Sequence, residues 1–137
     1  ISNKLGPIPI CPPDKQVKAF FSKLGTVIEI KNEKLSKSFW VSSSMMAPYY
    51  ELLKVLSDWL VQRGIKRNVA QKYITSLFVA LSEDSLINSK KHLKYLVKSS
   101  QTPRGLNEHA IKYLKKVGFY RHFSKSLNSI LKRLNNV

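Results

Sequence analysis

Mainly apolar residues recur at heptad spacing between Leu35 and Leu60 of this 137-residue chain. One helical face runs in alternating steps of four and three through Leu35, Phe39, Ser42, Met46, Tyr49, Leu53, Leu56 and Leu60. This spacing predicts one long helix. A second apolar stripe runs beside it through Met45, Leu52, Val55 and Trp59. A helix that is apolar on two faces has to be covered on two sides, so we expect a helical bundle in which a second subunit supplies part of the cover.

Further helical patterns follow the long one. Pro48 lies inside the long helix, where proline removes a backbone donor, so we expect a kink there and an end at Gly64. Four later segments have helical periodicity, namely Arg67–Ile87, Lys90–Lys98, Leu106–Val117 and the stretch from Phe119 to Leu134. The chain is therefore predicted to be all-α over residues 32–137.

The first thirty residues have a different pattern. The proline-interrupted apolar run Leu5–Pro13 suits an edge strand or a connecting segment. Asp14–Leu24 has helical spacing and stops at Gly25, and Thr26–Ile30 is a β-branched strand candidate. A strand, helix and strand of this size cannot bury their own faces. Residues 1–31 are therefore predicted to be the end of a sheet domain, separate from the helical domain of residues 32–137.

The charge of the chain is strongly positive. It has 24 Lys and Arg against 8 Asp and Glu, a net charge of +16, which first suggests a polyanionic partner. Beyond Asp84 there are 12 basic residues and one acidic residue, Glu108. Lysine outnumbers arginine 19 to 5, however, and base-specific contacts favour arginine. We therefore favour a solvated lysine face, and nucleic acid is not the partner we expect.

Several classes of protein are excluded by what the sequence lacks. The single cysteine, Cys11, has no partner for a disulfide, and no His and Cys cluster has metal-site spacing. No apolar run approaches the roughly 20 residues that a membrane span needs, so we expect a cytoplasmic protein. No glycine-rich phosphate loop occurs, and no catalytic residue can be assigned. The chain alone is therefore not expected to be a complete enzyme.

Two loops are candidates for binding. Ser42–Ser44 provides small hydroxyl residues, which serve either tight packing or contact with a polar ligand. In the second loop, Thr102 is predicted to cap a helix whose first turn contains Pro103. Gly105 would let the backbone present its N–H groups to an anion at that helix end. An ordinary capped helix and an anion-binding loop both fit this second pattern.

Five segments occur in the order found in one known family. They are Phe21–Glu29, Ser42–Ser44, Gln62–Ile65 followed by Ala70, Thr102–Gly105 and Leu114–Phe119. In these segments the chain resembles a divergent C-terminal dimerisation domain of the pyrroline-5-carboxylate reductase family. The resemblance implies a helical bundle of the 6-phosphogluconate dehydrogenase C-terminal type, intertwined with a second copy in a homodimer. It also implies that residues 1–31 are the last strand, helix and strand of a Rossmann domain that precedes this chain.

The family resemblance also implies a function. The full-length protein would be an NAD(P)H-dependent oxidoreductase of proline biosynthesis that reduces a C=N or C=O bond in a small anionic acid. Its NADP or NAD would be held by the Rossmann domain, so this chain would bind no cofactor and be inactive alone. Its partners would be a second copy and the substrate, with no metal and no membrane involved.

The resemblance is carried over residue by residue. It implies substrate binding by Ser44, Thr102, Arg104, Gly105, Leu106 and Asn107, and a dimer interface at Leu53, Leu56 and Leu60. This chain departs from the family where Met45 and Met46 replace a glycine and a proline, Arg104 replaces a glycine and Asn107 replaces a threonine. We therefore expect a bulkier, less polar pocket floor, and the resemblance does not identify pyrroline-5-carboxylate as the substrate. The alternative is a non-catalytic basic module that binds nucleic acid or another polyanion.

Overall fold

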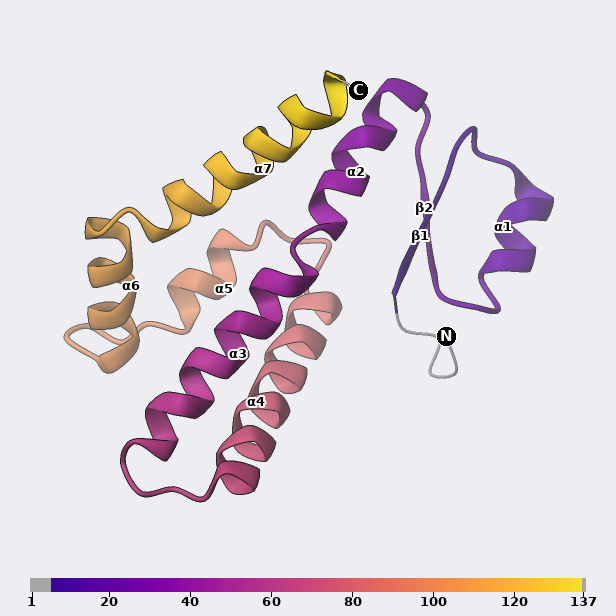
Figure 1. Ribbon diagram of the computed structural model, residues 1–137. Helices are drawn as coiled ribbons and strands as arrows, with labels where there is room; N and C mark the ends of the chain where they lie inside the picture. Colours follow the sequence, from indigo (N-terminus) through magenta and orange to yellow (C-terminus); the bar gives the residue numbers. More distant parts are fainter. Residues whose placement is uncertain (1–5, 137) are drawn as a thin grey trace. The chain divides into compact units, whose positions relative to one another are not determined.

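The computed structural model describes residues 6–136, so Leu5, at the start of the predicted first strand, lies outside the described residues. The elements are β1 (Pro7–Ile10), α1 (Lys15–Phe21), β2 (Thr26–Glu29), the 3₁₀ turn η1 (Glu33–Leu35), α2 (Ser36–Ser43), α3 (Met46–Val61), α4 (Arg67–Ile87), α5 (Lys94–Ser99), α6 (Leu106–Lys116) and α7 (Phe119–Asn135) (Figure 1). They form two compact units, one reaching Met45 and including the chain from Lys125, the other covering Met46–Ser124. The predicted fold class, helical with a short N-terminal β-α-β segment, is confirmed.

The first unit contains the strand, helix and strand that the sequence predicted. β1 and β2 pair in parallel, with Pro7 opposite Thr26 and Ile10 opposite Glu29. The Asp14 carboxylate accepts hydrogen bonds from the backbone N–H groups of Gln16 and Val17, both at 2.8 Å, and so starts α1. A Cβ on Gly25 would lie 2.7 Å from the Gly6 carbonyl oxygen. Glycine at this position therefore allows β2 to begin close beside β1.

The prediction of one long central helix is wrong in one respect, because the segment forms two helices. α2 ends at Ser43 and α3 begins at Met46. The Ser44 N–H bonds back to the Val41 carbonyl and the Met45 N–H to the Ser42 carbonyl, a tight i to i−3 pattern that ends α2. Pro48 then falls in the first turn of α3, where no backbone donor is required, so it causes no kink within that helix.

The later helices follow the predicted pattern, with one correction. α4 has the predicted bounds, and α6 and α7 agree within one residue at each end. The short helix predicted at Lys90 instead begins at Lys94. The ring nitrogen Nδ1 of His92 accepts a hydrogen bond from the Lys94 N–H at 3.0 Å, so the histidine satisfies a donor at the start of α5.

Helices α3 and α4 lie side by side and form the main packed pair of the second unit (Figure 1). Small residues are buried in this pair, since Ala70 has no exposed surface and Ser57 is 3% exposed. The Ser57 hydroxyl donates to the Leu53 carbonyl oxygen at 2.8 Å, so this buried polar group is satisfied within its own helix. The rings of Tyr49 and Phe78 meet edge to face at 6.0 Å.

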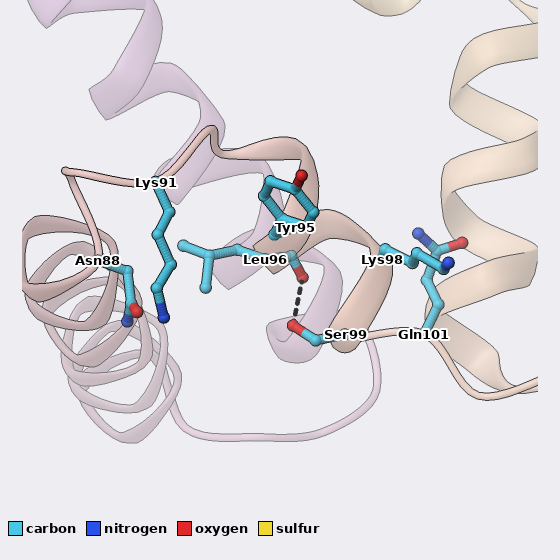
Figure 2. A pocket seen from close by; sticks show the side chains of 7 residues that line it. All are labelled: Asn88, Lys91, Tyr95, Leu96, Lys98, Ser99 and Gln101. Carbon is cyan, nitrogen blue, oxygen red and sulfur yellow. Dashed lines mark hydrogen bonds between the residues drawn. The ribbon is translucent and has the colours of Figure 1, made fainter.

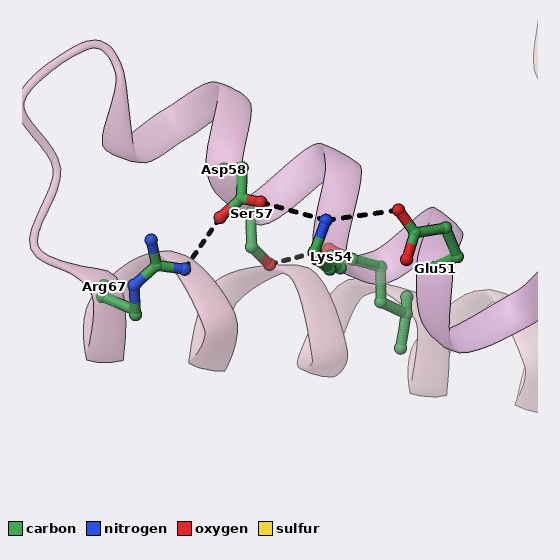
Figure 3. Close-up of polar contacts among 6 residues, drawn as sticks. Glu51, Lys54, Ser57, Asp58 and Arg67 are labelled. Atoms are coloured by element: carbon green, nitrogen blue, oxygen red, sulfur yellow. Dashed lines mark hydrogen bonds and ion pairs between the residues drawn. The ribbon is translucent and has the colours of Figure 1, made fainter. Parts of the chain in front are cut away.

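An ion-pair network joins the start of α4 to the end of α3 (Figure 3). Asp58 accepts a hydrogen bond from the Arg67 guanidinium at 2.7 Å and lies 3.6 Å from the Lys54 ammonium, which also contacts Glu51. The Arg67 hydrogen bond is the main cause that lowers the pKa of Asp58 below its ordinary value. Because these groups are solvated, we expect the network to add little stability. Its main effect is to orient the turn between α3 and α4.

Much apolar surface is left uncovered. Within residues 6–136, the buried hydrophobic residues are Ile10, Ile30, Val41, Ala70 and Ile74. Large apolar side chains are exposed on both α3 and α4, including Trp59 at 51% and Ile87 at 75%. Scattered exposed apolar residues are normal, but a surface of this extent indicates an interaction site. None of the helices in the described part of the chain is both long enough and apolar enough to cross a membrane.

The close contact between α3 and α4 gives a stability prediction. Ala70→Leu inserts three carbon atoms where no space is available, so we expect a loss of about 1–3 kcal/mol in the free energy of unfolding, measured with urea. Ala80→Leu makes the same change at an exposed position of the same helix and is expected to cost less than about 0.5 kcal/mol. Equal losses in the two variants would contradict the packing described here.

Candidate functional site

The loop before α6 has a defined backbone path. The Gly105 N–H donates to the Thr102 carbonyl oxygen at 2.8 Å, and Arg104 has a positive φ of 62°. A Cβ on Gly105 would lie 2.2 Å from the Thr102 hydroxyl oxygen and 2.9 Å from its carbonyl oxygen. Position 105 therefore requires glycine, because any side chain there would collide with Thr102. Residue 104 has a backbone conformation that favours glycine, yet it bears the long cationic side chain of arginine.

The predicted cap of this helix is wrong, although its apolar pattern begins at Leu106 as expected. Thr102 and Pro103 belong to the preceding turn, and α6 begins at Leu106 with Gly105 as its N-cap residue. No side chain caps the helix at Gly105. Among residues 6–136, the structure records no acceptor for the backbone N–H groups of Leu106, Asn107 and Glu108. These three donors stand at the positive end of the α6 dipole, which is the arrangement that binds a carboxylate or phosphate.

Glu108 organises the loop, and sequence reasoning missed it. One carboxylate oxygen accepts from the Arg104 N–H at 2.7 Å, and the other pairs with the Lys112 ammonium at 2.8 Å. The Lys112 hydrogen bond is the larger cause that lowers the pKa of Glu108, followed by the Arg104 N–H. The spacing of Glu108 and Lys112, four residues apart on one helix, was the available sequence signal.

The other predicted loop residues have different surroundings. The Asn107 side-chain amide donates to the Ser100 carbonyl oxygen at 2.8 Å and so ties α6 to the end of α5. Leu106 is 90% exposed. The structure records no hydrogen-bond partner in the described chain for the Thr102 hydroxyl or the Arg104 guanidinium. These two groups, with the free N–H groups, are available to a ligand.

Ser44 belongs to the first compact unit and the loop to the second. Its hydroxyl donates to the Val41 carbonyl oxygen at 2.6 Å, so its proton is already used within the break between α2 and α3. The neighbouring Ser42 and Ser43 line a hollow of about 210 Å³ together with Phe39, Ile28 and the prolines of β1. Sequence reasoning did not foresee this hollow, because it joins residues far apart in the chain.

The predicted interface residues Leu53, Leu56 and Leu60 are half-buried on α3. The large apolar residues that α3 leaves more exposed are Met46, Tyr49, Tyr50, Val55 and Trp59. The Arg63 guanidinium lies over the Trp59 ring at 3.5 Å from its centroid, which holds the exposed indole in place. The interface role of the three leucines stays a prediction. No group of three or more His, Cys, Asp and Glu suited to a metal ion occurs in residues 6–136.

The backbone of the loop gives a second stability prediction. Arg104→Gly removes a Cβ from a left-handed conformation, and Arg104→Ala removes only the guanidinium and most of the side chain. We expect the glycine variant to be about 1 kcal/mol more stable than the alanine variant in urea unfolding. A glycine variant that is less stable than the alanine variant would show that residue 104 has another conformation in solution.

Comparisons with solved structures agree on the fold. The structure of pyrroline-5-carboxylate reductase from Coxiella burnetii is similar to 98% of this chain, with a TM-score of 0.80 and 20% identity, over 53% of its own length. The Streptococcus pyogenes enzyme matches 89% of this chain and 47% of its own, at a TM-score of 0.74 and 20% identity. The Plasmodium falciparum enzyme, solved with NADP bound, matches 87% of this chain and 45% of its own, at a TM-score of 0.70 and 20% identity.

Sequence comparison identifies the family. The chain spans about half the length of the solved relatives. No protein in the search of curated sequences matches it. The family model described as pyrroline-5-carboxylate reductase dimerisation, however, matches residues 32–137, which is well over half of the chain. The chain therefore belongs to the pyrroline-5-carboxylate reductase dimerisation family.

Proposed function

We propose that this chain is the dimerisation and substrate-loop part of an NAD(P)H-dependent reductase that acts on a C=N or C=O bond of a small acid. The observation that carries the proposal is the start of α6, where the N–H groups of Leu106, Asn107 and Glu108 have no recorded acceptor beside the exposed cation Arg104. Those donors suit the carboxylate of a substrate. Thr102 and Arg104 add a hydroxyl and a guanidinium, and the latter binds a carboxylate through two parallel hydrogen bonds.

The cofactor belongs to a part of the protein other than these residues. The connection from β1 to α1 is Cys11, Pro12, Pro13 and Asp14, with no glycine-rich turn to approach a pyrophosphate. The described residues therefore do not fit a dinucleotide by themselves. In the proposed reductase, residues 1–31 complete a Rossmann domain that binds NADP or NAD, and the nicotinamide supplies the hydride. A relative from Plasmodium falciparum has been solved with NADP bound.

The proposed active form is a homodimer. The exposed apolar side chains of α3 and α4 support this, because one chain leaves them in water. The membership of a dimerisation family supports it independently. The role in proline biosynthesis and the cytoplasmic location stay predictions, as does the alternative of a non-catalytic basic module.

The substrate role of α6 can be tested at Leu106. In the reductase that contains this chain after a Rossmann domain, Leu106→Pro removes one N–H donor at the first helical position, where proline is well tolerated. Gly105 before it has an extended backbone that suits a following proline. Losing one hydrogen bond to a carboxylate is expected to lower kcat/KM by roughly tenfold to a hundredfold, mostly through KM.

Leu106→Ala is the matched control, because it removes the same side chain and keeps the N–H. NADPH oxidation is followed with a panel of cyclic imino acids, and the alanine variant is expected to stay within about twofold of the parent. Equal losses in the proline and alanine variants would reject the donor role. A protein that binds NADPH and oxidises it with no substrate of the panel would reject the proposed activity.

The dimer is tested by light scattering on the 137-residue chain. We expect the mass of two chains. Leu56→Glu places a charge on the predicted interface, so it is expected to shift the mass toward one chain while the helical circular dichroism signal remains. Lys72→Glu, an exposed position on α4, is expected to leave the dimer intact. A monomeric parent chain would contradict the proposed dimer.

A further inference from the structure

Residues 88–117, which include helices α5 and α6, carry most of the uncompensated positive charge of the second unit. Residues 88–117 contain seven lysines and one arginine against one acid, Glu108. That acid is already engaged, since it pairs with the Lys112 ammonium and accepts from the Arg104 N–H. Within the described chain, the remaining lysines of this segment have no recorded ion pair with a carboxylate.

Three of these lysines line one hollow of about 430 Å³. Lys94 and Lys98 come from α5, one helical turn apart, and Lys115 comes from the last turn of α6. Thr102 and the acidic residue Glu108 also line the hollow. The Glu108 carboxylate is paired with the Lys112 ammonium, and no hydrogen bond is recorded for the Thr102 hydroxyl within residues 6–136. Cations that converge from two elements repel one another, so an anion bound between them offsets that repulsion.

A second hollow of about 530 Å³ shares Lys98 and Gln101 with the first (Figure 2). It adds Lys91 and Tyr95, and the Tyr95 side chain is 57% exposed. Figure 2 places Lys98 and Gln101 next to each other, apart from Asn88 and Lys91. Lys98 therefore stands where the two hollows meet, with further cations on both sides.

We infer that the hollow lined by Lys94, Lys98 and Lys115 binds a small ligand with two adjacent phosphate groups. The three ammonium groups outnumber the one lining carboxylate, Glu108, which is already paired with Lys112. They match the charge of a diphosphate better than that of a single carboxylate, and lysine binds phosphate as a point charge. Both hollows have the size of small-molecule sites. Because lysine is depleted from interface centres, this cluster suits surface that a second copy leaves free. The inferred site shares Thr102 with the proposed substrate loop, but its test requires no reductase activity.

The test is calorimetric titration of the 137-residue chain with inorganic pyrophosphate at low salt and without a nicotinamide cofactor. We expect one site per chain. Lys98→Gln and Lys115→Gln are each expected to weaken binding at least tenfold, because each removes a lining cation. Lys72→Gln makes the same charge change on α4, outside both hollows, and is expected to change the affinity less than twofold. Circular dichroism checks that every variant is folded.

Titration with ADP distinguishes two sources of the diphosphate. ADP that binds as well as pyrophosphate indicates recognition of the phosphates alone. ADP that binds more tightly, with the gain lost in Tyr95→Leu, indicates a nucleotide whose ring uses the second hollow. Absence of saturable pyrophosphate binding would overturn the inference. A loss in Lys72→Gln equal to that in Lys98→Gln, with tighter binding of single-stranded oligonucleotide, would overturn it too, because such a surface would be a general polyanion surface.

Discussion

The contact of α3 with α4 at Ser57 and Ala70 is the constraint on which the second unit depends. Two small residues let the helices approach closely, and the buried serine hydroxyl is satisfied within its own helix. This pairing uses only one side of each helix, so Trp59 on α3 and Tyr73 on α4 remain exposed. The apolar surface left over is what a dimerisation domain requires, and the family match to residues 32–137 agrees with it.

The sequence predicted the helices well where apolar spacing was sustained. α4 occupies the predicted residues, and α7 begins where expected. It failed at Ser44 and Met45, because heptad spacing reports which residues share a face and does not report whether the helix is continuous. Pro48 was interpreted as a kink inside a helix, yet proline fits the first turn of a helix equally well. A helix that breaks before Pro48 and a helix that kinks at Pro48 have nearly the same apolar sequence pattern, so the pattern does not distinguish them.

The sequence singled out the loop of the candidate site. It did not predict the helix cap or the hydrogen bonds that hold this loop. The loop Thr102–Asn107 was singled out, and Gly105 has the close approach that a required glycine needs. The helix starts later than the threonine and proline suggested, since Gly105 is the N-cap residue. Glu108 was noted only as the single acidic residue beyond Asp84, although it holds the loop through the Arg104 N–H. Such side-chain-to-backbone bonds depend on a turn geometry that residue types alone do not determine.

Arg104 and Gly105, at the centre of this loop, have different roles in it. The path of the chain depends on Gly105, where any side chain would collide with Thr102. The chemical character depends on Arg104, whose left-handed backbone admits a cation at a modest cost in strain. Mutation of residue 104 can therefore alter the charge of the loop without moving the backbone amides at the start of α6, which the proposed function assigns to the substrate carboxylate. The charge of this loop and the path of its backbone are therefore set by different residues, so one can change while the other is kept.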